Sequence, residues 1–168
     1  IYRGAATSNG SNGRGIYSGG WNFANDTFYN VIDYITIGMP GNAADFGDLT
    51  QTKYDNASTS NGTNNRGIVY AMGTNKDTIN YITITSIGNA SNFGNMVGRR
   101  EGCSACSNAT NDRGLNIGGS DGQARNYIEY ITISTTGNAT DFGDIWYENS
   151  VWGAATSNGT SNRGIIAH

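Results

Sequence analysis

Short segments in which apolar and polar residues alternate recur along this chain of 168 residues. The clearest segment is Tyr-Ile-Thr-Ile, which occurs at residues 34–37, 81–84 and 130–133. Each copy is followed by a Gly-Asn-Ala triplet and then by Asp-Phe-Gly-Asp or Asn-Phe-Gly-Asn. β-branched and aromatic residues that alternate with a period of two predict strands. The tyrosine and the phenylalanine are 12 residues apart in every copy, which indicates one supersecondary unit repeated in tandem.

A second marker, Arg-Gly followed by an apolar residue, begins at positions 14, 66, 113 and 163. It divides the chain into three whole repeats, with a partial repeat at each end. We expect four short strands in each whole repeat, joined by turns rich in Asn and Gly. The sequence therefore predicts one all-β repeat domain over residues 1–168. Its parts are residues 1–13, 14–65, 66–112, 113–162 and 163–168.

The composition supports strands and turns. Glycine occurs 25 times, only 36% of the residues are hydrophobic, and 14% are charged. No window shows the periodicity of an amphipathic helix, and no apolar run has the length of a membrane span. The net charge of −3 argues against a nucleic-acid partner, which requires a clustered basic surface. We therefore expect neither nucleic-acid binding nor membrane insertion.

The two cysteines and the single histidine give little support for a metal site. Cys103 and Cys106 form one Cys-x-x-Cys pair, and a zinc site requires further ligands that the only histidine, His168, does not supply. Cys106 takes the repeat position that Thr59 holds in the preceding copy, so it is interpreted as a small, half-buried substitute for threonine. We expect no metal from this pair and no cofactor.

Carboxylates also follow the repeat. Asp45 and Asp48 could bind calcium, but the second copy has amides at these positions, and aspartate in such a turn more often caps the backbone. Asp33 and Glu129 share one repeat position, where the second copy has Asn80. With no histidine in the interior and no convergent acid–base pair, the sequence predicts a protein that is not an enzyme.

One connection varies in length while the rest of the repeat does not. From the glycine that ends the first strand to the tyrosine of the second, the step is 14, 8 or 11 residues. A repeat protein can place function in such a loop without disturbing its core. Exposed aromatic residues beside Asn and Asp suit sugar stacking or protein contact. The binding candidates are Trp21, Phe23, Asn25, Phe28, Tyr29, Lys76, Asp121, Arg125, Trp146 and Trp152.

The remaining aromatic residues recur and are predicted to be core. They are the repeat tyrosines Tyr34, Tyr81 and Tyr130 and the repeat phenylalanines Phe46, Phe93 and Phe142. For Trp146 and Trp152, packing over a terminal repeat is an equally open interpretation.

The Gly-Gly doublet at residues 19–20 and 118–119, the tyrosine some ten residues later and the aromatic residue after it resemble the kelch-type β-propeller repeat. The amino-acid sequences of the Tyr-Ile-Thr-Ile and Gly-Asn-Ala-Thr-Asp-Phe-Gly-Asp segments are similar to segments of kelch-like proteins of marine bacteriophages (cyanophages), notably tail-fibre and virion proteins. This resemblance implies propeller blades in a non-enzymatic structural or adhesion module on the virion surface, which is extracellular. The variable loops would bind a host surface, including its glycans, or a partner protein. The alternative is a sugar-binding lectin with a β-trefoil or β-prism fold, because both have three-fold repeats.

The terminal pieces predict association. Residues 1–13 and 163–168 together supply two strands of a four-stranded unit. An open array would leave apolar faces exposed. We therefore expect this chain to associate with other copies or other virion proteins, or to form part of a longer array.

Overall fold

The computed structural model describes residues 1–8, 10, 13–62, 65–73, 77–108, 111–147, 151–159 and 162–167. Over these residues the chain forms fourteen β-strands and no helix, so the all-β prediction is confirmed. No helix in these ranges is long and apolar enough to cross a membrane.

The strands form three sheets of four strands and one of two, and each sheet is an antiparallel meander in chain order. The first sheet contains β1 (Ala5–Thr7), β2 (Arg14–Asn22), β3 (Thr27–Thr36) and β4 (Ala44–Asp48). The second contains β5 (Lys53–Thr59), β6 (Arg66–Gly73), β7 (Thr78–Thr83) and β8 (Ser91–Asn95). The third contains β9 (Ser104–Ser107), β10 (Arg113–Ile117), β11 (Tyr127–Thr132) and β12 (Thr140–Asp144). The two-stranded sheet contains β13 (Ala154–Ser157) and β14 (Gly164–Ala167).

The sheets are offset by one strand from the repeats that the sequence suggests. Because the predicted repeats begin at Arg-Gly, the strand before each Arg-Gly pair ends a repeat, but in the structure it pairs with the strand after Arg-Gly. β5 therefore belongs with β6 and not with β4. The reason is local, because a short hairpin joins these two strands and favours their pairing. Residues 1–13 thus contribute β1 to a complete first sheet. Residues 14–65 contain four strands, as predicted, but the fourth, β5, belongs to the second sheet.

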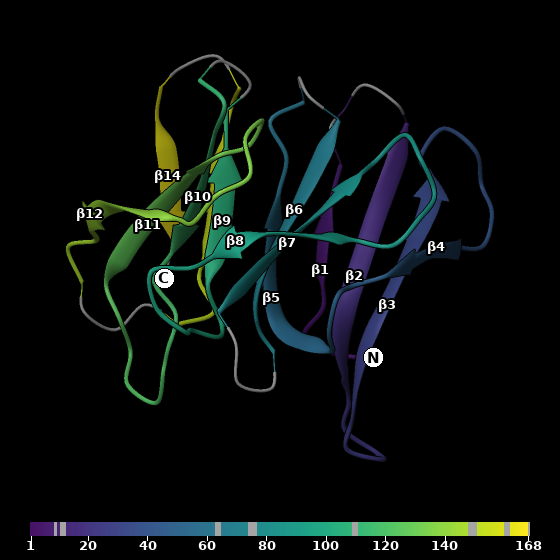
Figure 1. Cartoon of the computed structure of the whole chain (residues 1–168), viewed down its shortest axis with the longest axis horizontal. Helices are drawn as coiled ribbons and strands as arrows, with labels where there is room; N and C mark the ends of the chain where they lie inside the picture. Colours follow the sequence, from purple (N-terminus) through teal and green to yellow (C-terminus); the bar gives the residue numbers. More distant parts are fainter. Residues whose placement is uncertain are drawn as a thin grey trace.

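The sheets stack face to face in chain order, as the colours of Figure 1 show from purple and blue through teal to green and yellow. The second sheet is covered on both faces. Val69, Ile82 and Ile84 pack against the first sheet. Ile68, Tyr70, Ile79 and Phe93 pack with residues of the third sheet that include Ile131 and Ile133.

This stacking disagrees with a β-prism or a β-trefoil. In a β-prism, each of the three sheets turns one face to a common centre, whereas here the second sheet lies between the other two. A β-trefoil also requires a closed barrel of hairpins, and these sheets are separate meanders. The sheets do not close into a ring within the described part of the chain.

The Gly-Asn-Ala triplet joins each sheet to the one before it. Gly88 and Ala90 donate backbone N–H bonds to the carbonyls of Phe46 and Asp48, both at 2.8 Å. The backbone N–H of Asp48 donates in return to Oδ1 of Asn89 at 3.0 Å. The same three bonds link the second and third sheets, from Gly137 and Ala139 to Phe93 and Asn95 (2.8 Å each) and from Asn95 to Asn138 (3.0 Å).

The repeated arginines form a second link between sheets. Nη1 of Arg14 donates to the carbonyl of Ile84 at 2.7 Å, and Nη1 of Arg66 donates to Ile133 at 2.9 Å. Each guanidinium also lies over the repeat tyrosine of its own sheet, 5.0 Å from the ring centroid of Tyr34 for Arg14. The arginines therefore belong to the scaffold.

Glycine in the Phe-Gly-Asp segment permits the close approach of the sheets. A Cβ atom on Gly94 would lie 2.0 Å from the carbonyl oxygen of Gly137, and one on Gly47 would lie 2.6 Å from that of Gly88. Gly143 has a similar backbone, with φ of 138° against 155° for Gly94, but nothing lies within 4 Å of its Cβ position. The third sheet thus repeats the local conformation without the inter-sheet contact.

These two glycines give a matched pair for testing the contact. Gly94→Ala and Gly143→Ala carry the same kind of backbone strain, but only the first creates a clash with the next sheet. We expect Gly94→Ala to lower the free energy of unfolding by about 1–3 kcal/mol more than Gly143→Ala. Urea melts of the two variants measure the difference, and equal losses would show that the approach at Gly94 contributes nothing.

The repeat aromatics are buried only where another sheet covers them. Phe46 and Phe93 are 1% and 3% exposed, as predicted. Phe142 is 50% exposed, so its assignment to the core was wrong. Each phenylalanine meets its tyrosine edge to face in the same way, with centroids 6.0, 6.1 and 6.1 Å apart. The tyrosines are half-buried. The hairpin of Phe142 has the same conformation as the other two. Its ring is more exposed because the sheet that follows does not cover it.

The same comparison predicts unequal losses of stability. Phe93→Ala removes a buried ring and should cost about 3–5 kcal/mol of unfolding free energy. Phe142→Ala removes a half-exposed ring and should cost about 1 kcal/mol or less. Denaturant melts of both variants check this, and a small loss for Phe93→Ala would contradict the assigned core.

Candidate functional site

One residue with a left-handed backbone lies just before, or within, the first strand of each sheet. These residues are Arg3, Asp55, Gly102 and Trp152, with φ of 62°, 51°, 65° and 58°. Each of them comes two residues before Ala5 or before the residue that corresponds to Ala5 in its own sheet. Hydrogen bonds connect them in series, from Gly102 N–H to the Asp55 carbonyl (3.2 Å) and from Trp152 N–H to the Gly102 carbonyl (2.7 Å). β1, β5, β9 and β13 also contact one another in series. The four positions therefore meet along one edge of the stack.

Arg3 is the centre of this edge. Its guanidinium carbon lies 5.3 Å from the ring centroid of Trp21 and 5.7 Å from that of Trp152. Nη1 of Arg3 also forms an ion pair with Oδ2 of Asp55 at 3.1 Å. The Asp55 side chain is 1% exposed and the Arg3 side chain 44%. A buried carboxylate thus holds a partly exposed cation between two indole rings.

The carboxylates beside Arg3 are perturbed by burial. Burial raises the pKa of Asp55, and the positive charge of Arg3 opposes that rise. Burial, and then the charge of Asp55, raise the pKa of the nearby Glu101. The positive charge of Arg3 therefore favours the ionised forms of Asp55 and Glu101, two carboxylates that are only partly solvated.

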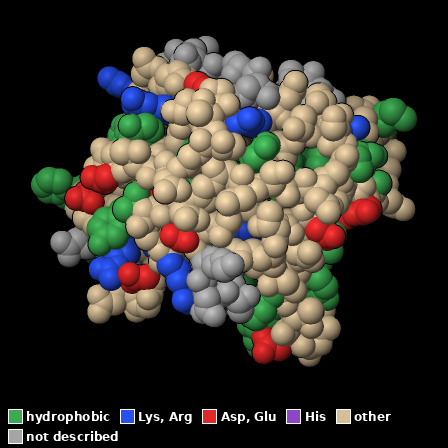
Figure 2. Space-filling view, viewed as in Figure 1, with side chains coloured by type: hydrophobic (Ala, Val, Ile, Leu, Met, Phe, Trp, Pro, Cys, Tyr) green, Lys and Arg blue, Asp and Glu red, His purple; other side chains and the backbone are tan. Residues whose placement is uncertain are grey.

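The β2–β3 hairpin supplies an aromatic wall next to Arg3. Trp21 meets Phe23 edge to face at 5.2 Å and stacks on Phe28 at 5.9 Å, and Phe28 stacks on Tyr54 at 4.5 Å. Tyr2 joins the wall through two backbone bonds of 2.7 Å with Trp21. In Figure 2, hydrophobic side chains gather on the projection formed by this hairpin, on a surface of mostly uncharged polar atoms.

Tyr2, Arg3, Trp21 and Phe23 line a pocket of about 400 Å³. Phe23 and Tyr2 are 68% and 64% exposed, so their rings are available to a ligand. We call these four residues together with Trp152 the Arg3 cluster.

The structure brings together four of the predicted binding residues, Trp21, Phe23, Phe28 and Trp152. Asn25 lies exposed in the same hairpin, and the half-buried Tyr29 pairs with Gly20 in the ladder. Trp146 is fully exposed and has no ring partner within the described residues, so it does not pack over the third sheet. Lys76 lies outside the described residues.

Asp121 and Arg125 lie in the β10–β11 connection. They form an exposed ion pair at 2.8 Å, and side-chain hydrogen bonds from Arg125 lower the pKa of Asp121. This connection projects from the same edge as the β2–β3 hairpin, at the bottom of Figure 1.

Sequence reasoning missed Arg3, Asp55, Tyr2 and Tyr54. One signal was present, because the position two residues before the Ala-Ala-Thr segment holds four different residue types in a repeat that is otherwise constant. A position that varies within the repeat is not required by the fold, so its side chain is available for function. No pattern in the sequence indicated that Arg3 contacts both Trp21 and Trp152, because these contacts depend on how the sheets stack.

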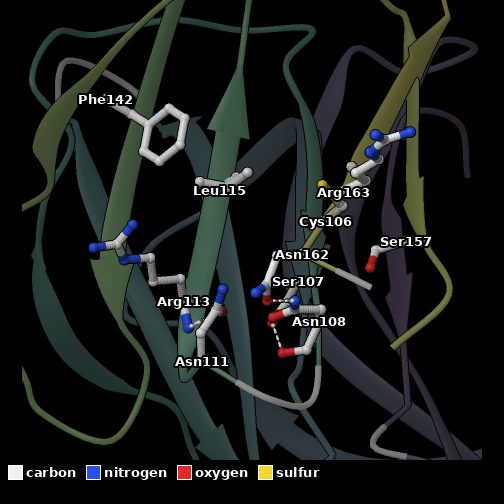
Figure 3. A pocket seen from close by; sticks show the side chains of 11 residues that line it. Cys106, Ser107, Asn108, Asn111, Arg113, Leu115, Phe142, Ser157, Asn162 and Arg163 are labelled. Atoms are coloured by element: carbon white, nitrogen blue, oxygen red, sulfur yellow. Dashed lines mark hydrogen bonds between the residues drawn. The ribbon is translucent and has the colours of Figure 1, made fainter. Parts of the chain in front are cut away.

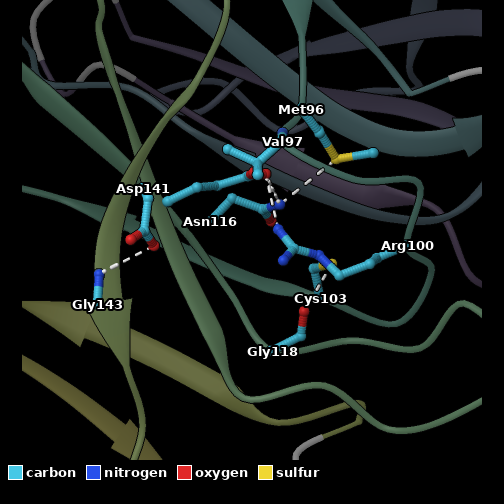
Figure 4. A network of polar contacts seen from close by, with 9 residues as sticks. Met96, Val97, Arg100, Cys103, Asn116, Gly118, Asp141 and Gly143 are labelled. Atoms are coloured by element: carbon cyan, nitrogen blue, oxygen red, sulfur yellow. Dashed lines mark hydrogen bonds and ion pairs between the residues drawn. The ribbon is translucent and has the colours of Figure 1, made fainter.

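Figure 4 shows Arg100, Asn116 and Val97 of a buried polar network, in which Glu129 is the common partner. Its Oε1 pairs with Nη2 of Arg100 at 2.9 Å and accepts from Nδ2 of Asn116 at 2.7 Å. Its Oε2 accepts the backbone N–H of Val97 at 2.7 Å. Both charged side chains are 1% exposed. Asn80 accepts the N–H of Thr50 at 3.1 Å in the equivalent place, so this repeat position links neighbouring sheets.

Lys53 holds the position in the second sheet that Arg100 holds in the third. Its Nζ donates to the carbonyl of Thr78 at 2.5 Å, and the residue is fully buried. Burial lowers the pKa of Lys53 to about 8, with the charge of Asp77 acting in the opposite direction. The lysine is therefore close to losing its proton at mildly alkaline pH.

This shift predicts a pH-dependent stability. Between about pH 8 and its ordinary pKa of 10.5, Lys53 holds fewer protons in the folded than in the unfolded state. The free energy of unfolding should therefore rise with pH in this window. Relative to Lys53→Met, which has no such proton, the wild-type chain should gain about 2–3 kcal/mol between pH 7 and pH 10. Urea melts across this range measure the difference, and a difference that does not change with pH would contradict the shifted pKa.

Both cysteines are buried thiols. Cys106 lies opposite Leu115, as Thr59 lies opposite Ile68, which confirms that Cys106 takes the threonine position. Cys103 donates to the carbonyl of Gly118 at 3.3 Å, and burial raises its pKa to about 11.

No group of three or more His, Cys, Asp and Glu side chains is placed to hold a metal ion in the described ranges. The Asp-Phe-Gly-Asp segment caps its own turn, since Asp141 Oδ1 accepts the N–H of Gly143 at 3.3 Å. Asn92 accepts from Gly94 in the same way at 3.2 Å, so an amide serves equally well.

No protein-family model matches the chain, and no curated protein sequence matches it significantly.

Proposed function

We propose that this protein is a non-enzymatic adhesion module that binds carbohydrate through the Arg3 cluster. On the resemblance of its repeats to those of cyanophage tail-fibre proteins, we further propose that it acts on a virion surface, outside the cell. In this proposal, the stacked sheets are blades of a kelch-like propeller array, and the variable edge contacts the host or a partner protein.

The observation that carries the proposal is the arrangement around Arg3. A guanidinium held between two indole rings, beside the exposed Phe23, offers hydrogen-bond donors flanked by aromatic faces. Such faces stack on the apolar side of a sugar ring while the guanidinium donates to its hydroxyl groups. Because Asp55 fixes Arg3 in place, less side-chain entropy is lost when a ligand binds.

Binding of a partner protein is a second candidate. Tyr, Trp and Arg are the residues enriched at the centres of protein interfaces, and the Arg3 cluster contains all three. The two candidates differ in the size of the surface they require. A glycan needs only the pocket of about 400 Å³, whereas a protein partner would also cover the β10–β11 connection with Asp121 and Arg125.

Glycan-array binding followed by titration tests the proposal. We expect micromolar to millimolar binding to at least one surface glycan, weakened about tenfold by Phe23→Ala or Trp152→Ala, which each remove a stacking face. Trp146→Ala is the matched control, because Trp146 is fully exposed and lies outside the cluster.

The control variant should bind as the wild-type chain does. Equal weakening by Trp146→Ala would contradict the Arg3 cluster as the binding site, and an array without any bound glycan would contradict carbohydrate binding. Weakening by Asp121→Ala as strong as that by Phe23→Ala would favour the partner-protein candidate.

A further inference from the structure

The pocket of the Arg3 cluster presents aromatic rings and one charged hydrogen-bond donor. None of the described residues that line it carries a carboxylate or an amide side chain. The pocket in Figure 3, which lies between the third sheet and the two-stranded sheet, has a different lining. It contains asparagine side chains that bond to each other, Asn108 to Asn162 at 3.1 Å. The Arg3 pocket therefore favours a ligand that supplies a strong acceptor.

Arg3 is the donor that such a ligand meets. A guanidinium carries five N–H groups in one plane. Nη1 donates to Oδ2 of Asp55 at 3.1 Å, which orients this plane. The Arg3 side chain is 44% exposed and lines the pocket, so further N–H groups reach a ligand there. The indole N–H of Trp21 does not compete, because it donates to Oδ1 of Asp26 at 3.0 Å.

Carboxylates outnumber cations around Arg3. Asp55 pairs with it, and Asp26 accepts from the neighbouring indole. Glu101 interacts electrostatically with Arg3, Asp55 and Arg99. Among the described residues, three carboxylates thus surround two guanidinium groups, which leaves an excess of one negative charge.

This balance of charge decides which acceptor suits the site. A sugar carboxylate would bond to Arg3 but would be repelled by the neighbouring carboxylates, and an ammonium group has no acceptor and is repelled by Arg3. The carbonyl oxygen of an acetamido group is a neutral acceptor, and a methyl group lies beside it. The Phe23 ring, which is 68% exposed in the same pocket, offers an apolar surface for that methyl group.

We propose that the Arg3 cluster selects sugars that carry an N-acetyl group. This inference rests on the proposed carbohydrate binding and names its ligand class. The acetamido carbonyl oxygen accepts from the Arg3 guanidinium, and the acetamido methyl group packs against Phe23. Arg3 determines the specificity, while Trp21 and Asp55 hold it in position.

The test is calorimetric titration of the whole chain with methyl β-glycosides that differ at one substituent. The probes are the glycosides of N-acetylglucosamine, glucose, glucosamine and glucuronic acid, with the galactose series run in parallel. In at least one series, the N-acetyl sugar should bind at least about tenfold more tightly than each of the others, because it gains a bond to a charged donor. Because this ligand is neutral, its affinity should change less than about twofold between about 50 mM and 500 mM salt.

A matched pair of variants tests the role of Arg3. Arg3→Lys keeps a cation for Asp55 but replaces the planar guanidinium with a single ammonium group. The affinity ratio of the N-acetyl sugar to the unsubstituted sugar should fall to about twofold or less. Arg125→Lys makes the same substitution at an exposed arginine on the β10–β11 connection and should leave the ratio unchanged. If Arg3→Lys does not fold, the titrations of the wild-type chain still decide the proposal.

The outcomes separate this inference from carbohydrate binding itself. Equal affinity for the N-acetyl and the unsubstituted sugar would overturn the selectivity and leave carbohydrate binding intact. Tightest binding of the uronic acid or of the amino sugar would also overturn it, because charge would then decide. If only larger glycans bind, a bound glycan is compared with its de-N-acetylated form, and equal binding overturns the inference. Bound glycans that all lack an N-acetyl group overturn it too, and no binding of any sugar would remove both proposals.

Discussion

The structure depends on one contact, in which the Gly-Asn-Ala triplet of each sheet bonds to the backbone of the Phe-Gly-Asp segment before it. These bonds use mainly backbone groups, so the sheets are held at a fixed distance whatever the neighbouring side chains are. Gly47 and Gly94 are required there because a Cβ atom would collide with the next glycine's carbonyl group. Each bond contributes only about 1 kcal/mol net. Together with the arginine link and the isoleucines behind it, they join the sheets into one stack.

This contact also explains why the repeat divides into a constant and a variable part. The hairpin from the repeat tyrosine to the repeat phenylalanine carries both halves of the contact, so its length cannot change without misplacing one of them. Within the residues that the structure describes, the connections at the opposite ends of the strands take part in no inter-sheet bond of this kind. They can differ in length and residue type, as the aromatic residues of the β2–β3 hairpin and the longer β10–β11 connection show.

Buried charged side chains stabilise the stack, and their residue types differ between the second and third sheets. The third sheet has the Arg100–Glu129 pair with Asn116, and the second has Lys53 on a backbone carbonyl with Asn80 nearby. Breaking one partner of such a pair leaves an uncompensated buried charge, which is costly. The Arg100 and Glu129 side chains are each only 1% exposed, in contrast to Arg3, whose side chain is 44% exposed.

The sequence by itself determined the strands and their number in each repeat, because alternation, turn residues and constant spacing are local properties. It also indicated the edge that carries Trp21 and Phe23, since variable loops stand out from a constant repeat. Only the tertiary structure decided which strand begins each sheet, whether Phe142 is covered as Phe46 and Phe93 are, and that Arg3 lies between Trp21 and Trp152. Burial and long-range contacts depend on which sheet lies against which face, and identical local sequences do not carry that information.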